Sequence, residues 1–455
     1  MKKEIKFLII IFLLSVSLRL VFIDTSYFIW DEAVYLLHGK MFAGVNVGYE
    51  ELSSRPPLIS LIISPLWHLG NFELAVRILI AIINSLIVVP VYYLGKILSK
   101  KTGMISAILI AILPASVTHS RYILTDHMGA LLALTTILFF FLGTKERKSK
   151  LLYIGSIFLT LSILMKFTNI LLFLLLIPFL IMLLAEKRIK EILISGAVFL
   201  ATLSPYLLFN YLSFGEPLHT FLKAWRIVAK PVPVNFDFFA YIFNDTFGLI
   251  FLVVSLIGFI AFARKILSKP TIRNKFLTGT LIFIFIVALA YFIGVVNIEV
   301  AKQPTIEWEA ERFMLLSITF FTIFIGYGLL SLSKLVGKKY TLPFIAIIFI
   351  LGLFLLSPQI MRTYDSQIEF ENGLRNITKE MGLFLKSSDI QEFACWGNCP
   401  PIAYYSEKKM NVFYSQNDLT ASETEYKVIF KEIENSNVIE SFCKEEWCVY
   451  LHNDK

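Results

Sequence analysis

Only 17% of the 455 residues in this chain are charged, and a few of the charged residues border long apolar runs. Asp31 and Glu32 are adjacent in FIWDEAVYLLHGKMF, and Asp126 ends the stretch SRYILTD. The cations that accompany these carboxylates are Arg55, Arg77, Lys166 and Arg312. A carboxylate can take a proton from an attacking hydroxyl or amide, and cations stabilise a leaving phosphate on which negative charge grows. The set therefore suits transfer of a sugar from a polyprenyl phosphate, which needs no general acid because the phosphate is a good leaving group.

The two adjacent carboxylates cannot share one role. Neighbouring residues on a helix point about 100° apart, so only one of them can face a given atom. We predict Asp31 as the catalytic base, with Glu32 orienting it or holding the loop.

Each of these residues also has an ordinary structural interpretation. Asp31 and Asp126 can cap the helices that follow them, and Glu32 can interact with the helix dipole from a first turn. The cations can reach lipid headgroups from helix ends. Their collection on one face is what favours a site. His38, His119 and His127 lack metal-ligand spacing, so the pattern requires no cofactor, and assistance by a divalent metal ion stays open.

The elements that position these residues must be membrane helices. Hydrophobic residues make up 57% of the chain, and its mean hydropathy is +0.72. Apolar runs of about 17–25 residues form helices in lipid, where unpaired backbone groups are costly. Such runs lie near residues 7–23, 77–98, 103–120, 127–142, 151–165, 168–185, 192–212, 246–263, 276–296, 313–333 and 341–357. We predict an all-α polytopic bundle of about 11 transmembrane helices over residues 1–357.

The direction of these helices follows from their loops. Every second loop is rich in Lys and Arg, beginning with the N-terminus, which places those loops and the N-terminus in the cytoplasm. This alternation requires that the apolar segment 56–69 does not span, since it is short and contains Pro65. We interpret it as a juxtamembrane or re-entrant helix within one long outer loop, 24–76. All the candidate site residues then lie on the outer face of a cell-membrane protein.

The tail, 358–455, differs from the rest of the chain in charge and in cysteine content. It carries a net charge of −6 against +14 for residues 1–357, so the overall +8 belongs to the membrane part and does not indicate nucleic acid. One amphipathic helical stretch, near 370–386, precedes four β-prone runs, QEFACW, NVFY, YKVIF and CVYLH. We predict a small extracytoplasmic α/β domain, in which disulfides are more plausible than zinc. The candidate cysteines are Cys395, Cys399, Cys443 and Cys448.

At the candidate site the sequence resembles the glycosyltransferase C superfamily, in the branch of protein O-mannosyltransferases and the lipid A aminoarabinose transferase. The matching motifs are WDEAVY, SSRPPL and AVRILI in that order, then RYILTD, MKFTN and, more loosely, ERFMLL. The resemblance implies Asp31 as the catalytic base and Asp126 as a second acidic site residue. It also implies Arg55 and Lys166 as ligands of the lipid phosphate. Arg312 is a further candidate, and its motif matches the family least closely.

Two departures limit the resemblance. The loop 213–245 is too short for the lectin-like modules of the mannosyltransferases, which argues against protein O-mannosylation. The tail also lacks a motif of the Trp-Trp-Asp-Tyr-Gly type that oligosaccharyltransferases carry.

These features predict an inverting glycosyltransferase. Its partners would be membrane lipids, a polyprenyl-phosphate sugar, dolichyl-linked in an archaeon, and a glycan, lipid or protein acceptor. The alternative is a transporter or flippase of lipid-linked sugars, but the spans are nearly free of charge and no internal repeat is found. A third alternative, a receptor-like protein acting through its tail, leaves the loop residues unexplained.

Overall fold

The computed structural model describes most of the chain and divides it into two compact units. The described residues are 2–21, 30–45, 54–69, 72–228, 249–267, 279–287, 307–334, 376–413, 424–430, 437–444 and 447–453, with a few single positions between them. The first unit comprises residues 1–22, 79–121 and 125–363, and the second comprises 23–78, 122–124 and 364–455.

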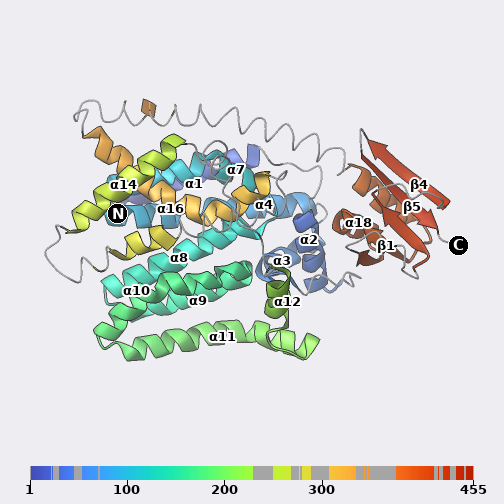
Figure 1. Ribbon diagram of the computed structural model, residues 1–455, viewed down its shortest axis with the longest axis horizontal. Coiled ribbons are helices and arrows are strands. Elements are labelled where there is room, and N and C mark those ends of the chain that lie inside the picture. The colour runs from blue at the N-terminus through green and yellow to red at the C-terminus, as the bar shows by residue number, and fades with distance from the viewer. Residues whose placement is uncertain are drawn as a thin grey trace. The chain divides into compact units, whose positions relative to one another are not determined.

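The first unit is made of helices (Figure 1). Its described helices are α1 (Lys2–Val21), α5 (Val88–Leu98), α6 (Lys100–Ile112), α7 (Pro114–His119), α8 (Thr125–Lys145), α9 (Ser149–Met165), η3 (Phe167–Leu171), α10 (Leu172–Ala185), α11 (Ile189–Phe214), α12 (His219–Val228), α14 (Leu249–Leu267) and α16 (Glu307–Ser333). Helix α4 (Phe72–Ser85) begins in the second unit and ends in the first. Figure 1 shows α8, α9, α10 and α11 lying side by side.

Close contacts between these helices depend on small residues. Gly258 in α14 lies against the Phe324 carbonyl of α16, and Gly328 in α16 lies against the Val254 carbonyl of α14. A Cβ atom at either glycine would overlap with backbone. Such close approach is typical of helices that associate within lipid.

Five stretches are long and apolar enough to cross a membrane, so the prediction of a multi-pass membrane protein is confirmed in outline. They are Phe72–Leu98, Thr125–Lys145, Phe167–Ala185, Ile189–Phe214 and Leu315–Ser333. Helices α1, α6, α9 and α14 coincide with four further predicted runs. The run 341–357 and the end of the run 276–296 lie outside the described residues. The count of eleven therefore stays a prediction.

The apolar segment 56–69 forms two short helices, α3 (Leu58–Ile63) and η2 (Ser64–His68). Their combined length of about 19 Å is well short of the roughly 30 Å hydrocarbon core. This supports the prediction that the segment does not span.

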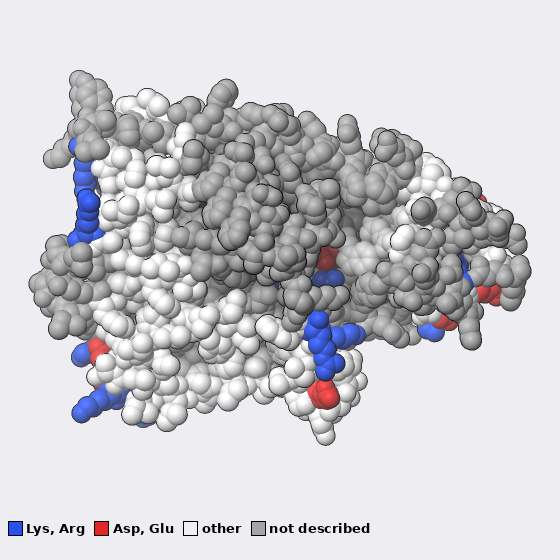
Figure 2. Space-filling view, in the orientation of Figure 1, with Lys and Arg blue, Asp and Glu red and all other residues white. Residues whose placement is uncertain are grey.

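Basic turns of the first unit are tied together by ion pairs. Glu4 binds Lys96 at 2.8 Å and Lys100 at 3.2 Å, and Arg147 binds Glu186 at 3.3 Å. The N-terminus thus lies beside the α5–α6 turn, and the α8–α9 turn beside the α10–α11 turn. Figure 2 shows Lys and Arg at the edges of a broad uncharged surface. This arrangement is the one expected if these turns share one side of a membrane; which side that is stays a prediction.

The second unit joins the loop helices to the tail. It contains α2 (Trp30–Phe42), α3, η2 and the first residues of α4, and α2 packs against α3 and against α18 (Cys399–Ser406) of the tail. Ser60 of α3 donates a hydrogen bond to the Tyr35 carbonyl of α2 at 3.0 Å.

The tail forms the predicted small sheet domain, with a helix over 376–387 and α18. Its strands are β1 (Glu392–Trp396), β2 (Lys409–Phe413), β3 (Tyr426–Ile429), β4 (Asn437–Lys444) and β5 (Trp447–Asn453). They run in the order β2-β1-β3-β5-β4. β1 pairs in parallel with β2 and β3, whereas β5 pairs antiparallel with β3 and β4.

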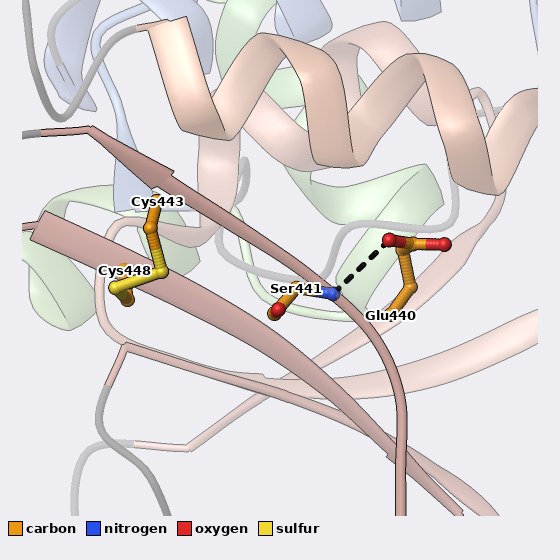
Figure 3. The surroundings of a disulfide bond; sticks show 4 residues. All are labelled: Glu440, Ser441, Cys443 and Cys448. Carbon is orange, nitrogen blue, oxygen red and sulfur yellow. Dashed lines mark hydrogen bonds between the residues drawn. A yellow bond between two sulfur atoms is a disulfide. The ribbon is translucent and has the colours of Figure 1, made fainter.

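Each cysteine of the tail forms a disulfide with the cysteine nearest to it in the sequence. Cys395 at the end of β1 pairs with Cys399 at the start of α18, and Cys443 in β4 pairs with Cys448 in β5 across directly opposed strand positions. Figure 3 shows the second disulfide near Ser441, whose backbone N–H donates to the Glu440 carboxylate.

Candidate functional site

Asp31, which the sequence analysis predicts to be the base, lies in the first turn of α2. Asp31 and Glu32 form the acidic first turn of α2, where carboxylates interact favourably with the helix dipole. Arg55, just before α3, binds Asp31 with 3.1 Å between Nη1 and Oδ1. Both side chains keep contact with solvent, at 16% exposure for Asp31 and 28% for Arg55. This ion pair is therefore accessible to a ligand.

The Glu32 side chain points in a different direction from that of Asp31, into the core of the second unit. Its Oε1 accepts hydrogen bonds from Arg77 Nη1 at 2.8 Å and from the backbone N–H of Ile123 at 2.9 Å. Glu32 is 0% exposed and Arg77 2%. A buried carboxylate bonded in this way holds three segments together, namely α2, the start of α4 and residues 122–124. The geometry favours the interpretation in which Glu32 holds the loop, and it gives Arg77 the same role.

A second charged pair lies in the first unit, where Lys166 Nζ is 2.5 Å from Asp126 Oδ1. Asp126 is in the first turn of α8, and Lys166 is the extended residue between α9 and η3. Asn169 fixes this turn by donating to the Gly129 carbonyl at 3.1 Å and to Ser162 Oγ at 2.8 Å. A Cβ atom at Gly129 would lie within 3.3 Å of both Asn169 and Lys166, so the glycine permits the close approach.

An apolar pocket of about 210 Å³ begins at the same turn. Thr168 and Asn169 line it at η3, and the rest of its wall comes from α10, the helix over 279–287 and α16, with Leu172, Val287 and Phe320 among the lining residues. The pocket thus begins two residues after Lys166 in the sequence, at the turn that Lys166 opens.

Sequence reasoning missed a polar network inside the first unit. Arg19 of α1 donates to Ser116 Oγ at 2.9 Å, and Ser116 Oγ is 2.9 Å from His127 Nε2. The available signal was an Arg within the apolar run 7–23, and the structure buries this Arg completely. His127 is bound to a serine, and no group of three His, Cys, Asp or Glu residues in the described part of the chain could hold a metal ion.

The structure thus groups six of the predicted site residues as three pairs, Asp31 with Arg55 and Glu32 with Arg77 in the second unit, and Asp126 with Lys166 in the first. The backbone of Arg312 belongs to α16, but its side chain lies outside the described residues.

Comparison with known proteins agrees with this architecture. Residues 54–209 match the family described as dolichyl-phosphate-mannose-protein mannosyltransferase. No curated protein sequence matches the chain.

Two solved membrane proteins are similar in fold. The oligosaccharyltransferase of Archaeoglobus fulgidus superposes with a TM-score of 0.65 at 15% identity, over 93% of this chain and 68% of that one. ArnT of Cupriavidus metallidurans, in a structure bound to undecaprenyl phosphate, superposes with a TM-score of 0.59 at 11% identity, over 98% of this chain and 97% of that one. The resemblance predicted from the loop motifs is therefore confirmed, and the chain has the fold of the glycosyltransferase C superfamily, of the mannosyltransferase and ArnT type.

Proposed function

We propose that this protein is an inverting glycosyltransferase that moves a sugar from a polyprenyl phosphate, such as dolichyl phosphate, to a glycan, lipid or protein at the outer membrane face. The family match over residues 54–209 and the two similar folds support glycosyl transfer from a polyprenyl phosphate in general. The donor sugar, the acceptor and the side of the membrane belong to the proposal.

The observation that carries the proposal is the accessible Asp31–Arg55 pair beside a buried Glu32–Arg77 pair. Of the two adjacent carboxylates, only Asp31 has solvent-exposed surface. It is therefore the carboxylate that an acceptor can reach.

In the proposed step the acceptor oxygen or nitrogen attacks the anomeric carbon of the donor sugar. The bond from that carbon to the phosphate oxygen breaks, and the polyprenyl phosphate leaves with the electron pair. Asp31 takes the proton of the acceptor group, and the configuration at the anomeric carbon inverts. Arg55 and Lys166 stabilise the negative charge that grows on the phosphate.

Lys166 suits this role because the apolar pocket begins two residues away. A cation at the turn where an apolar pocket begins suits a ligand with a phosphate head and an isoprenoid chain. ArnT in its crystal structure is bound to such a lipid, undecaprenyl phosphate. In this proposal Asp126 orients Lys166 through their ion pair, Glu32 and Arg77 position α2, and Arg312 is a further candidate for the donor phosphate.

The test is to incubate the purified protein with a panel of polyprenyl-phosphate sugars and to measure donor consumption. Asp31→Asn should lower the rate by about 10²- to 10⁴-fold, the usual contribution of a general base, while donor binding is retained. Asp389→Asn, the same change at an exposed position of the tail, is the matched control and should keep wild-type activity.

Two outcomes would overturn the proposal. Full activity in Asp31→Asn would remove the base, and movement of an intact donor across vesicles without sugar release would indicate a transporter. A parallel reaction with chelator tests for a divalent ion, because a lower rate with chelator would show that such an ion takes part.

A further inference from the structure

Lys40, in the last turn of α2, has an unusual environment for a lysine. The residue is 3% exposed, and its Nζ donates a hydrogen bond to the backbone carbonyl of Tyr404 at 3.0 Å. The same Nζ lies 4.0 Å from the centre of the Tyr404 ring and 4.6 Å from that of Trp67. Glu407 approaches it to 3.7 Å. The ammonium group is thus enclosed by two aromatic rings, a carbonyl and a carboxylate.

These contacts join the loop helix to the tail domain at the C-terminal end of α18. Tyr404 lies in the last turn of α18, where the helix dipole favours a cation. Glu407 ends that helix with φ +56°, a left-handed conformation that a non-glycine residue adopts at a cost of about 1 kcal/mol or more. Its carboxylate also binds Lys386 at 3.1 Å. A glycine would suit the backbone better, so the carboxylate is the feature that glutamate adds.

The tail side of this contact is rigidly held. The Cys395–Cys399 disulfide ties the start of α18 to β1, in the middle of the parallel part of the sheet. The Tyr404 side chain is also hydrogen-bonded to Glu73 in the first turn of α4. Helix α18 is therefore tied to the sheet at its start and to α2 and α4 near its end.

A buried charge is a costly way to join two elements. Burial lowers the pKa of Lys40 to about 8, so at neutral pH the charge is kept against the preference of its surroundings. An apolar side chain of similar length would fill the same space without that cost. Buried charges of this kind fix the register between elements in several proteins, where they add little to stability.

We propose that Lys40 is a positioning residue, through which the tail domain fixes the register of α2 and so the place of Asp31 at the other end of the same helix. The inference rests on the proposed function of Asp31. Asp31 and Lys40 are separated by about 13 Å along α2, so Lys40 touches no reacting atom. The Glu32–Arg77 pair holds the first turn of the helix, and Lys40 holds the last.

The first test compares Lys40→Met with Lys40→Arg in the full-length protein. Lys40→Met should lower kcat of donor consumption by about tenfold or more, since small misplacements of a catalytic group have effects of this size. KM for the donor should stay unchanged because Lys40 contacts no part of it. Lys40→Arg keeps the charge and the stacking on aromatic rings and should restore most of the rate. Lys409→Met, at an exposed lysine of β2, is the matched control.

A second measurement does not depend on activity. Hydrogen exchange of the backbone amides of α2 and α18 should become faster in Lys40→Met and stay as in wild type in Lys40→Arg and Lys409→Met. Faster exchange in a protein whose wild type consumes no donor would support the lysine contact and reject the proposed transferase. Trp67→Leu, which removes one ring from the enclosure, should change exchange in the same direction by a smaller amount, and it replaces Lys40→Met if that variant does not fold.

The inference is overturned if Lys40→Met keeps the wild-type kcat, or if exchange in α2 is unchanged. It is also overturned if the loss appears in KM for the donor, which would place Lys40 at the ligand.

Discussion

The two sides of α2 carry ion pairs that differ in what surrounds them. On the accessible side, Asp31 and Arg55 are 16% and 28% exposed and are joined by a contact of 3.1 Å. On the core side, Glu32 and Arg77 are almost wholly buried, and Glu32 also accepts the N–H of Ile123. Adjacent residues in the sequence thus occupy environments with different dielectric and different access.

This difference shows how the adjacent residues Asp31 and Glu32 can have separate roles. A partly exposed carboxylate can exchange its partner for a substrate, whereas a buried one that is bonded three times cannot do so without leaving a charge unpaired. Glu32 and Arg77 therefore provide the fixed support, and Asp31 and Arg55 provide the reactive surface in our proposal.

The largest expected effect is on stability, from breaking the buried pair. Arg77→Met leaves the Glu32 charge buried without its counter-ion and should lower the free energy of unfolding by about 3–5 kcal/mol. Asp31→Asn removes a partly exposed charge and should lower the free energy of unfolding by about 1 kcal/mol. Denaturation of the purified variants in detergent measures both values.

Equal losses in the two variants would break the comparison, because the exposed pair would then be as important to the fold as the buried one. Arg77→Lys serves as the control, since it keeps the charge and loses the two-pronged contact. Its free energy of unfolding should lie between those of Arg77→Met and wild type.

Many of the helices could be predicted from hydropathy, because an apolar run forms a helix within its own stretch of the sequence. Most described helices and four of the five tail strands lie where the sequence pattern placed them, and the segment 56–69 forms only short helices. The strand that was missed, β4, is an edge strand with Glu440, Ser441 and Lys444 in it and a register shift after Val438. Such a strand exists because β5, the next strand along the chain, pairs with it, and this pairing cannot be read from the residues of β4 alone.

The site was predictable in its residue types and less so in its partners. The charged residues were recognisable because apolar surroundings make each of them costly, but the pairing of Glu32 with Arg77 depends on three segments that are distant in sequence. Lys40 escaped notice for the same reason, as its enclosure is built by Trp67 and by Tyr404, which is 364 residues away.

The next effect in size concerns the accessible pair. Arg55→Met should leave the free energy of unfolding nearly unchanged and raise KM for the polyprenyl-phosphate sugar by about 10- to 100-fold, as expected for loss of a hydrogen bond to a charged group. Arg55→Lys should recover part of this loss. Donor titrations with each variant give the values, and an unchanged KM in Arg55→Met would remove Arg55 from the phosphate.

The last prediction is a pH dependence of stability that comes from Lys40, in the last turn of α2. Burial lowers the pKa of Lys40 from its ordinary 10.5 to about 8, in surroundings that include Glu407, Lys386, Glu73 and Tyr404. Between pH 8 and 10.5 the unfolded chain therefore binds more protons at Lys40 than the folded chain, so this residue should make the free energy of unfolding rise with pH across that window and contribute nothing further above it. The difference between wild type and Lys40→Met isolates the effect from other titrating groups and should change by about 3 kcal/mol over the window. A difference that is flat with pH would show that the charge at Lys40 is kept without cost, and the buried and accessible sides of α2 would then differ in contacts alone.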